Sequence, residues 1–175
     1  MKKLTKQQRE VKALKAKLPL AKPKRGDANK TAQQLIPVAD AWFSKYVRLR
    51  DSEFKGDGWY GECIDGCGRI LPVYVQGKWK SSSNNGHFIT RGVMSLRFDE
   101  INTNLQSAWC NAWRDKASMI EGYEQGLDMK YGSGTAKELK RLSGLPDAYK
   151  RPSKQELLRI IEDAKTYIEY TLEHK

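Results

Sequence analysis

This sequence of 175 residues contains only two histidines and three cysteines. It has no run of about 18 or more apolar residues, which argues against a membrane-spanning helix. Its basic N-terminus is not followed by an apolar segment, so a secretory signal is not expected. If the protein is cytoplasmic, its odd number of cysteines predicts thiols or metal ligands rather than disulfides. We therefore expect a soluble, cytoplasmic protein of one domain with appendages.

Positive charge is concentrated at the N-terminus. The formal net charge is +11, and residues 1–30 hold eleven Lys and Arg residues against two acidic ones. Such an arm suits the phosphate backbone of nucleic acids, because each contact releases condensed counterions. A solvated tail is the other interpretation, and anionic membranes also attract basic arms. The residues expected to contact nucleic acid are Lys2, Lys3, Lys6, Arg9, Lys12, Lys15 and Arg91.

Helical periodicity and capping signals predict most of the remaining structure. The basic residues 1–18 are expected to form a helix that frays, or a segment that orders on DNA. The periodicity of residues 31–52 predicts a second helix. Capping boxes predict three later helices that begin at Ser118, Thr135 and Ser153, the first of them ending at Gly132.

The middle of the chain has a different character. Residues 56–80 are rich in glycine and then alternate between apolar and polar, which predicts a β-hairpin preceded by a tight Cys turn. A further helix is expected to begin at residues 100–104 or after Cys110.

All three cysteines lie in this middle part. Cys63 and Cys67 stand in CIDGCG, where glycines allow a turn, and Cys110 follows in SAWCNAW. The spacing of the first pair suits half of a tetrahedral zinc site. The second half has a single cysteine, so water, a carboxylate such as Asp65 or another group would have to be the fourth ligand. Three separate thiols without a metal are the alternative.

His87 lies in SSSNNGHFITRG, and the other histidine, His174, is the second-last residue of the sequence. A neutral imidazole can take a proton from water at cellular pH, whereas many lone histidines are merely structural. Asn102 follows in INTNLQ, and Asn111 directly follows Cys110. This order suits phosphodiester hydrolysis assisted by a divalent cation, which stabilises charge on the phosphate and on the leaving oxygen.

Five short blocks together resemble a known family. They are WFSKYVRLRDSE, CIDGCG, NNGHFITRG, LRFDEINTNLQ and CN, and their order is similar to that of the phage recombination proteins called NinG or Rap, in the HNH group of ββα-metal nucleases. The resemblance spans about residues 41–132. It implies an α+β fold with a small ββα-metal core, zinc-knuckle-like Cys turns and flanking helices. The expected organisation is a basic arm (1–30), an HNH-like domain (31–132) and a helical extension (133–175).

The resemblance also implies an activity. It suggests a DNA endonuclease that hydrolyses phosphodiester bonds in branched recombination intermediates such as Holliday junctions, in the cytoplasm of the phage host. By position, His87 would be the general base, Asn102 would orient the motif loop, and Asn111 would bind the catalytic Mg²⁺ or Mn²⁺. Cys63, Cys67 and Cys110 would be three of four ligands of a structural zinc ion. A homodimer would suit paired cleavage of junctions.

Two positions depart from the family pattern. Ser107 replaces the third cysteine, and Asn84 replaces an acidic residue shortly before the Gly-His pair. Asn84 could offer a carbonyl oxygen to the catalytic cation, but without the charge that a hard cation prefers. The alternative function is therefore a non-catalytic DNA-binding protein that retains a degenerate HNH fold.

Overall fold

The computed structural model describes Ala13 and residues 25–175. The arm residues expected to contact nucleic acid, Lys2, Lys3, Lys6, Arg9, Lys12 and Lys15, lie outside the described residues, as does most of the helix expected over residues 1–18. Within the described part, no helix combines the length and apolarity needed to cross a membrane.

The chain divides into two compact units. One consists of Met1–Tyr46 with Arg151–Lys175, and the other of Val47–Lys150. The expected boundaries of the basic arm, the HNH-like domain and the helical extension, after residues 30 and 132, stay predictions. The mixture of helices and antiparallel sheets described below confirms the α+β class.

Helices form the described part of the first unit: α2 (Arg25–Ala28), most of α3 (Ala32–Arg50) and α7 (Lys154–Glu173). The α3 helix confirms the prediction for residues 31–52. The predicted capping box of α7 is also present, because the Ser153 hydroxyl accepts from the Glu156 N–H and the Glu156 carboxylate accepts from the Ser153 N–H. Tyr46 and Tyr167 pack edge to face between α3 and α7, with ring centroids 5.0 Å apart.

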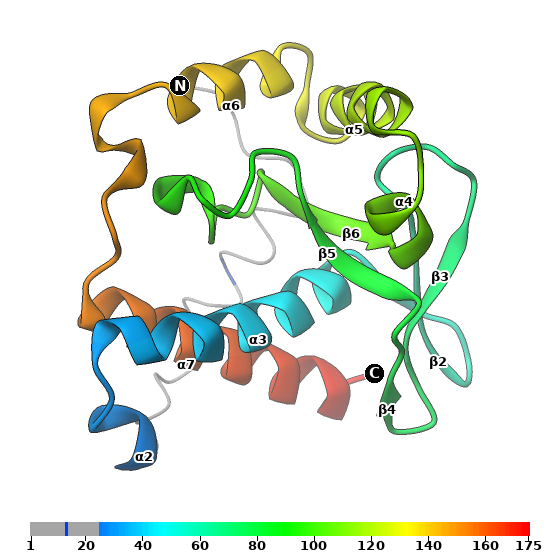
Figure 1. Ribbon diagram of the computed structural model, residues 1–175. Helices are drawn as coiled ribbons and strands as arrows, with labels where there is room; N and C mark the ends of the chain where they lie inside the picture. Colours follow the sequence, from blue (N-terminus) through cyan, green and yellow to red (C-terminus); the bar gives the residue numbers. More distant parts are fainter. Residues whose placement is uncertain (1–12, 14–24) are drawn as a thin grey trace. The chain divides into compact units, whose positions relative to one another are not determined.

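The second unit begins with a four-stranded antiparallel sheet in the order β1-β2-β3-β4 (Figure 1). Its strands are β1 (Glu53–Phe54), β2 (Gly58–Glu62), β3 (Ile70–Val75) and β4 (Lys78–Trp79). The predicted hairpin is thereby confirmed. Gln76 and Gly77 close it with positive φ angles of 52° and 73°, as a two-residue hairpin turn requires. The Cys turn connects β2 to β3.

A separate two-stranded ribbon pairs β5 (Ser83–His87) with β6 (Thr103–Ser107). Their register runs from Ser83 opposite Ser107 to His87 opposite Thr103. The short η1 (Met94–Leu96) lies in the connection between the two strands. The helix α4 (Ala108–Ala112) follows β6 directly and packs against both strands of the ribbon.

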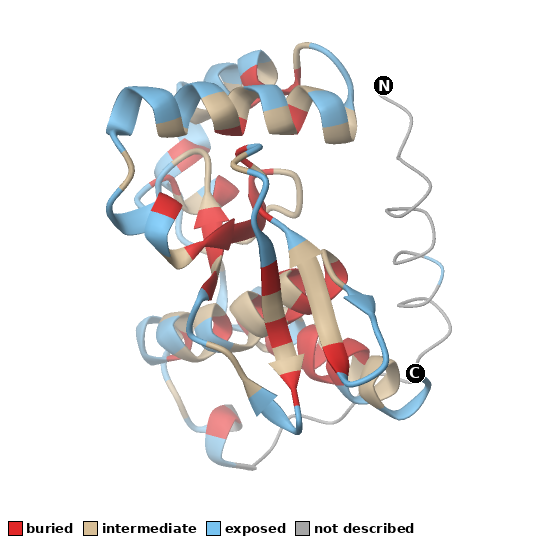
Figure 2. Cartoon of the chain, turned by 90° about the vertical axis from the view of Figure 1, so that its right-hand side faces the viewer, coloured by how far each residue is buried: buried red, intermediate tan, exposed pale blue. Residues whose placement is uncertain are grey.

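The helix expected at residues 100–104 or after Cys110 was wrongly placed. Residues 103–107 form β6, and α4 starts at Ala108, before Cys110. All five residues of β6 are buried, so neither face of the strand is exposed to solvent (Figure 2). Its polar side chains are satisfied by hydrogen bonds, which hides the alternation that usually marks a strand.

The helices α5 (Lys116–Tyr131) and α6 (Thr135–Ser143) and the short η2 (Pro146–Tyr149) complete the second unit. The expected end of α5 before Gly132 is confirmed, but both predicted capping boxes are wrong. The Asp115 carboxylate caps α5 three positions before Ser118, the expected cap. Asp128, on the preceding helix, accepts from the Gly134 and Ala136 N–H groups and so replaces a local cap at α6.

Candidate functional site

Four side chains converge around the Cys turn. The sulfur atoms of Cys63, Cys67 and Cys110 and a carboxylate oxygen of Asp65 all lie within 4.8 Å of one another. Ligands of a tetrahedral zinc ion at about 2.3 Å stand roughly 3.8 Å apart, so this cluster needs only a small contraction. Three thiolates and a carboxylate also form a donor set that zinc accepts. The structure thus brings the three predicted ligands together with Asp65, which was among the alternatives for the fourth ligand, and the four could hold a metal.

Ser107 has a different role from that of the cysteine it replaces. Its N–H donates to the Cys63 sulfur at 3.1 Å, and its hydroxyl accepts from the Trp109 N–H at 3.2 Å. Ser107 therefore caps α4 and, without belonging to the cluster, donates a hydrogen bond to Cys63, a candidate metal ligand. Contacts of this kind orient metal ligands.

Asp65 is buried and held from several sides. The Cys63 thiol donates to its carboxylate at 2.5 Å, and Gln106 Nε2 donates to its other oxygen at 3.4 Å. Arg114 lies 3.5 Å from the same carboxylate. These contacts hold the Asp65 carboxylate close to the sulfur atoms, where it could serve as a fourth metal ligand.

Burial controls the protonation of the thiols. It raises the pKa of Cys63 well above the ordinary value, and the hydrogen bond to Asp65 acts in the same direction. Burial also raises the pKa of Cys110, to about 11. A divalent cation reverses this preference because it binds the thiolate and not the thiol, so metal binding at this cluster should release protons.

Glycines on α5 let this helix approach the Cys turn closely. A Cβ atom at Gly126 would lie 1.8 Å from the Ile64 carbonyl oxygen, and one at Gly122 would lie 2.6 Å from the Asp65 carbonyl oxygen. Neither position can carry a side chain without displacing backbone. The Cys turn is therefore held against the backbone of α5.

His87 lies at the last position of β5 and is half-buried. Its Nε2 is 3.0 Å from the Arg97 carbonyl oxygen. Because a carbonyl can only accept, this contact places a proton on Nε2, and Nδ1 is then the basic nitrogen of the neutral ring. The contact fixes both the tautomer and the orientation of the imidazole.

Asn102 is fully buried and ties the connection between β5 and β6 together. Its Oδ1 accepts from the Ile89 N–H at 2.7 Å, and its Nδ2 donates to the carbonyls of Ile89 and Leu96 at 3.0 and 2.9 Å. The carboxylate of Asp99 accepts from the Asn102 N–H at 2.8 Å. Asn102 thus holds the segment that follows His87.

Replacing Asn102 with Ala should lower the free energy of unfolding by about 2–4 kcal/mol, because buried partners of its amide would lose their hydrogen bonds. Urea denaturation measures this loss. Gln125→Ala is the matched control, since Gln125 is exposed and donates only to Glu121 at 3.3 Å. It should change stability by less than about 0.5 kcal/mol. Equal losses in the two variants would contradict a special role for Asn102.

The remaining predicted residues lie around this ribbon. Asn111 is exposed on α4, and Arg91 is exposed in the loop after β5. Asn84 and His87 are three positions apart in one strand, so their side chains leave β5 on opposite faces. Asn85, which the sequence interpretation missed, shares the face of His87. It is buried, and its Oδ1 has no hydrogen-bond partner in the part of the chain that is described.

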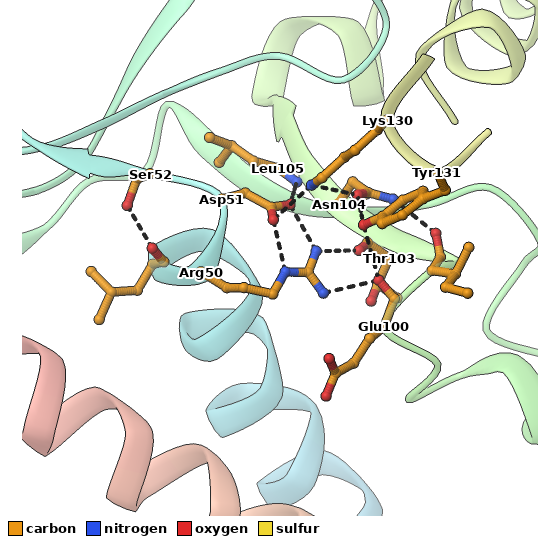
Figure 3. Close-up of polar contacts among 12 residues, drawn as sticks. Arg50, Asp51, Ser52, Glu100, Thr103, Asn104, Leu105, Lys130 and Tyr131 are labelled. Carbon is orange, nitrogen blue, oxygen red and sulfur yellow. Dashed lines mark hydrogen bonds and ion pairs between the residues drawn. The ribbon is translucent and has the colours of Figure 1, made fainter. Parts of the chain in front are cut away.

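A buried ionic network, which the sequence interpretation did not identify, contacts strand β6 of the ribbon. The carboxylate of Asp51 accepts two hydrogen bonds from Arg50, at 2.7 and 2.8 Å, and pairs with Lys130 at 2.7 Å (Figure 3). It also accepts from the Leu105 N–H at 3.0 Å. Arg50 in turn donates to the Thr103 carbonyl at 2.8 Å. The end of α3 and the end of α5 therefore both hold β6.

The charges of this network are mutually dependent. Burial alone would raise the pKa of Asp51, but Arg50 and Lys130 hold this pKa well below its ordinary value. Burial lowers the pKa of Lys130 to about 8, although Asp51 opposes the change. Lys130 and Tyr131 also donate to the side-chain oxygen Oδ1 of Asn104 at 2.9 and 2.7 Å. Local periodicity could not reveal these contacts, because the pair Arg50 and Asp51 is far in sequence from the pair Lys130 and Tyr131.

Comparison with known proteins gives a family for the chain. The family model described as "NinG: Bacteriophage Lambda NinG protein" matches residues 1–172. The chain belongs to the NinG family. This places it among phage proteins related to recombination, as the motifs around His87 and the cysteines had indicated. No curated protein and no solved structure matches the chain.

Proposed function

We propose that this NinG-family chain is a DNA endonuclease of the HNH group that cleaves branched recombination intermediates such as Holliday junctions. One observation carries the proposal. His87 lies on the first strand of an antiparallel ribbon, Asn102 directly precedes the second strand, and Asn111 lies on the helix packed against both strands. This strand–strand–helix order supports the ββα core that the HNH resemblance implies.

Each of the three residues has a role that its surroundings support. His87 would take the proton of the attacking water, with its ring held by the Arg97 carbonyl. Asn102 would act as a positioning residue, since its amide bonds the backbone that follows His87. Asn111 would bind the catalytic cation, because its side chain is exposed on the helix beside the ribbon.

The catalytic cation would be Mg²⁺ or Mn²⁺, which oxygen ligands hold and which would stabilise charge on the phosphate and the leaving oxygen. Asn84 is the second predicted ligand, and its position on the face opposite His87 makes it the weaker of the two. Asn84→Asp tests this assignment. If Asn84 binds the cation, the added charge should increase cleavage at low metal concentration; unchanged cleavage would remove Asn84 from the site.

The test of the function is a cleavage assay on a four-way junction and a linear duplex, with Mg²⁺ or Mn²⁺. His87→Ala should slow cleavage by roughly 10²- to 10⁴-fold, the usual contribution of general acid–base catalysis. His174→Ala is a matched control, because this exposed histidine contacts a carbonyl of its own helix end, that of Tyr170. Equal rates for His87→Ala and wild type would show that His87 is not the base.

A second candidate function rests on Ser107 and Asn84, which depart from the family pattern. In that case the chain would bind branched DNA without cleaving it. The same assay separates the two functions. Tight junction binding without cleavage under any divalent metal would support the non-catalytic protein and refute the nuclease.

A further inference from the structure

Two tryptophan side chains project from the short helix α4 and its end. Trp109 is 47% exposed and Trp113 is 80% exposed. They are four residues apart, about one helical turn, which places them on the same side. The apolar contribution of α4 to the core comes from Cys110, which is buried. Large exposed indoles that the core does not use mark an interaction surface.

An arginine is fixed beside these rings. The Arg69 guanidinium lies 4.3 Å from the ring centroid of Trp109, and it also donates to the Ser107 hydroxyl at 3.4 Å. A cation stacked on an indole and held by a second contact is preorganised for a ligand that carries both a flat ring and a negative charge.

The surface is anchored by the candidate metal cluster. Arg69 follows Cys67 by two residues, and Trp109 directly precedes Cys110. Folding of the cluster therefore sets the position of the arginine and of the first indole together. Because α4 also packs against the ribbon that carries His87, the surface lies on the same small substructure as the proposed catalytic residues.

We propose that Trp109, Trp113 and Arg69 form a stacking platform for unpaired bases of branched DNA, with Arg69 at the adjoining phosphate. The inference rests on the proposed function in taking DNA as the ligand. Nucleobases and phosphates supply the flat ring and the charge that the surface would recognise. Bases inside a duplex already stack on their neighbours, so the platform selects bases at a branch point, flap or single strand.

The main alternative occupant is a second copy of the chain. Ile70 is 52% exposed and directly follows Arg69, so it could extend an apolar contact. A stacked cation fits an aliphatic protein interface less well than it fits a base next to a phosphate. We therefore take DNA as the occupant, and self-association is one outcome of the test below.

The experiment measures binding of the full chain to fluorescent single-stranded, flapped and duplex oligonucleotides without a catalytic metal, by anisotropy. Trp113→Ala should weaken binding to single-stranded and flapped DNA by roughly 5- to 150-fold and binding to duplex much less, because one stacked base contributes about 1–3 kcal/mol. Trp113→Phe keeps a ring and should recover most of the affinity. Met129→Ala removes another exposed apolar side chain, 87% exposed on α5, and should have no effect.

Two results would overturn the platform. One is equal affinity of wild type and Trp113→Ala for every oligonucleotide. The other is a change of oligomeric state in Trp113→Ala, seen by light scattering, with DNA affinity unchanged, which would identify a self-association surface. Binding is measured without cleavage, so the two proposals can fail separately. If wild type does not cleave DNA but Trp113→Ala still weakens its binding to single strands, the platform stands and only the proposed nuclease activity is refuted.

Discussion

Purified protein should contain about one zinc ion per chain, and Cys63→Ser or Cys110→Ser should lose both the metal and the folded second unit. Both thiols are buried and point at Asp65 and Cys67. A structural zinc ion contributes about 10–16 kcal/mol in zinc-finger peptides at neutral pH, which exceeds the whole stability of many domains. Elemental analysis gives the metal content, and thermal unfolding followed by circular dichroism gives the loss of structure.

Two variants next to the cluster sharpen this test. Ser107→Ala removes a hydroxyl that caps α4 but binds no metal, so it should cost about 1 kcal/mol and keep the zinc. Asp65→Asn keeps the size of the side chain but loses its charge, and should weaken zinc binding without destroying the fold. Well-folded wild-type protein with almost no zinc would show that the cluster is not a metal site.

The second large effect is expected from Asp51→Asn. The Asp51 side chain is only 5% exposed and lies between Arg50 and Lys130, whose charges it balances. Removing one partner of a buried ion pair leaves charge uncompensated and costs about 3–5 kcal/mol. Urea denaturation at pH 7 measures the loss, which should come with weaker amide protection along β6, since the Leu105 N–H bonds Asp51.

An exposed ion pair provides the control. Arg141 and Glu138 on α6 are 58% and 45% exposed, with the charged atoms 2.9 Å apart. Glu138→Gln should therefore cost less than about 1 kcal/mol. If Asp51→Asn costs no more than Glu138→Gln, the buried network does not stabilise the fold.

The contribution of Asp51 should also depend on pH. Its pKa in the folded chain lies well below the ordinary value of about 3.9. The unfolded state therefore takes up the proton first as the pH falls, and stability declines below about pH 4. Below about pH 4 the difference between wild type and Asp51→Asn should therefore shrink as the pH falls. A difference that grows on acidification below pH 4 would contradict the lowered pKa.

Sequence predicted the elements whose signals are local. The helix α3 and the Ser153 box of α7 follow from residues within a few positions of one another, and the Cys turn follows from its glycines. The sequence interpretation failed where distant residues decide. Asp128 caps α6 across a turn, and β6 is buried on both faces, so neither leaves the usual local pattern.

The same distinction applies to the candidate site. The three cysteines were grouped correctly because their spacing is characteristic of metal ligands, and Asp65 was among the alternatives for the fourth position. Asp51, Arg50 and Lys130 were missed, because nothing near them in sequence indicates a shared buried charge. Asn85 was missed because its neighbour Asn84 stands at the position that the family pattern marks.

The glycines of α5 have a mechanical consequence. Gly122 and Gly126 bring the helix against the Cys turn, and Lys130, one turn beyond Gly126, reaches Asp51 and Asn104. The helix α5 thus connects the cysteine cluster directly to the ribbon that carries His87. The two glycines have no side chains that could adjust to a displacement of the cluster. We therefore expect such a displacement to move α5 and, through the contacts of Lys130, to disturb β6.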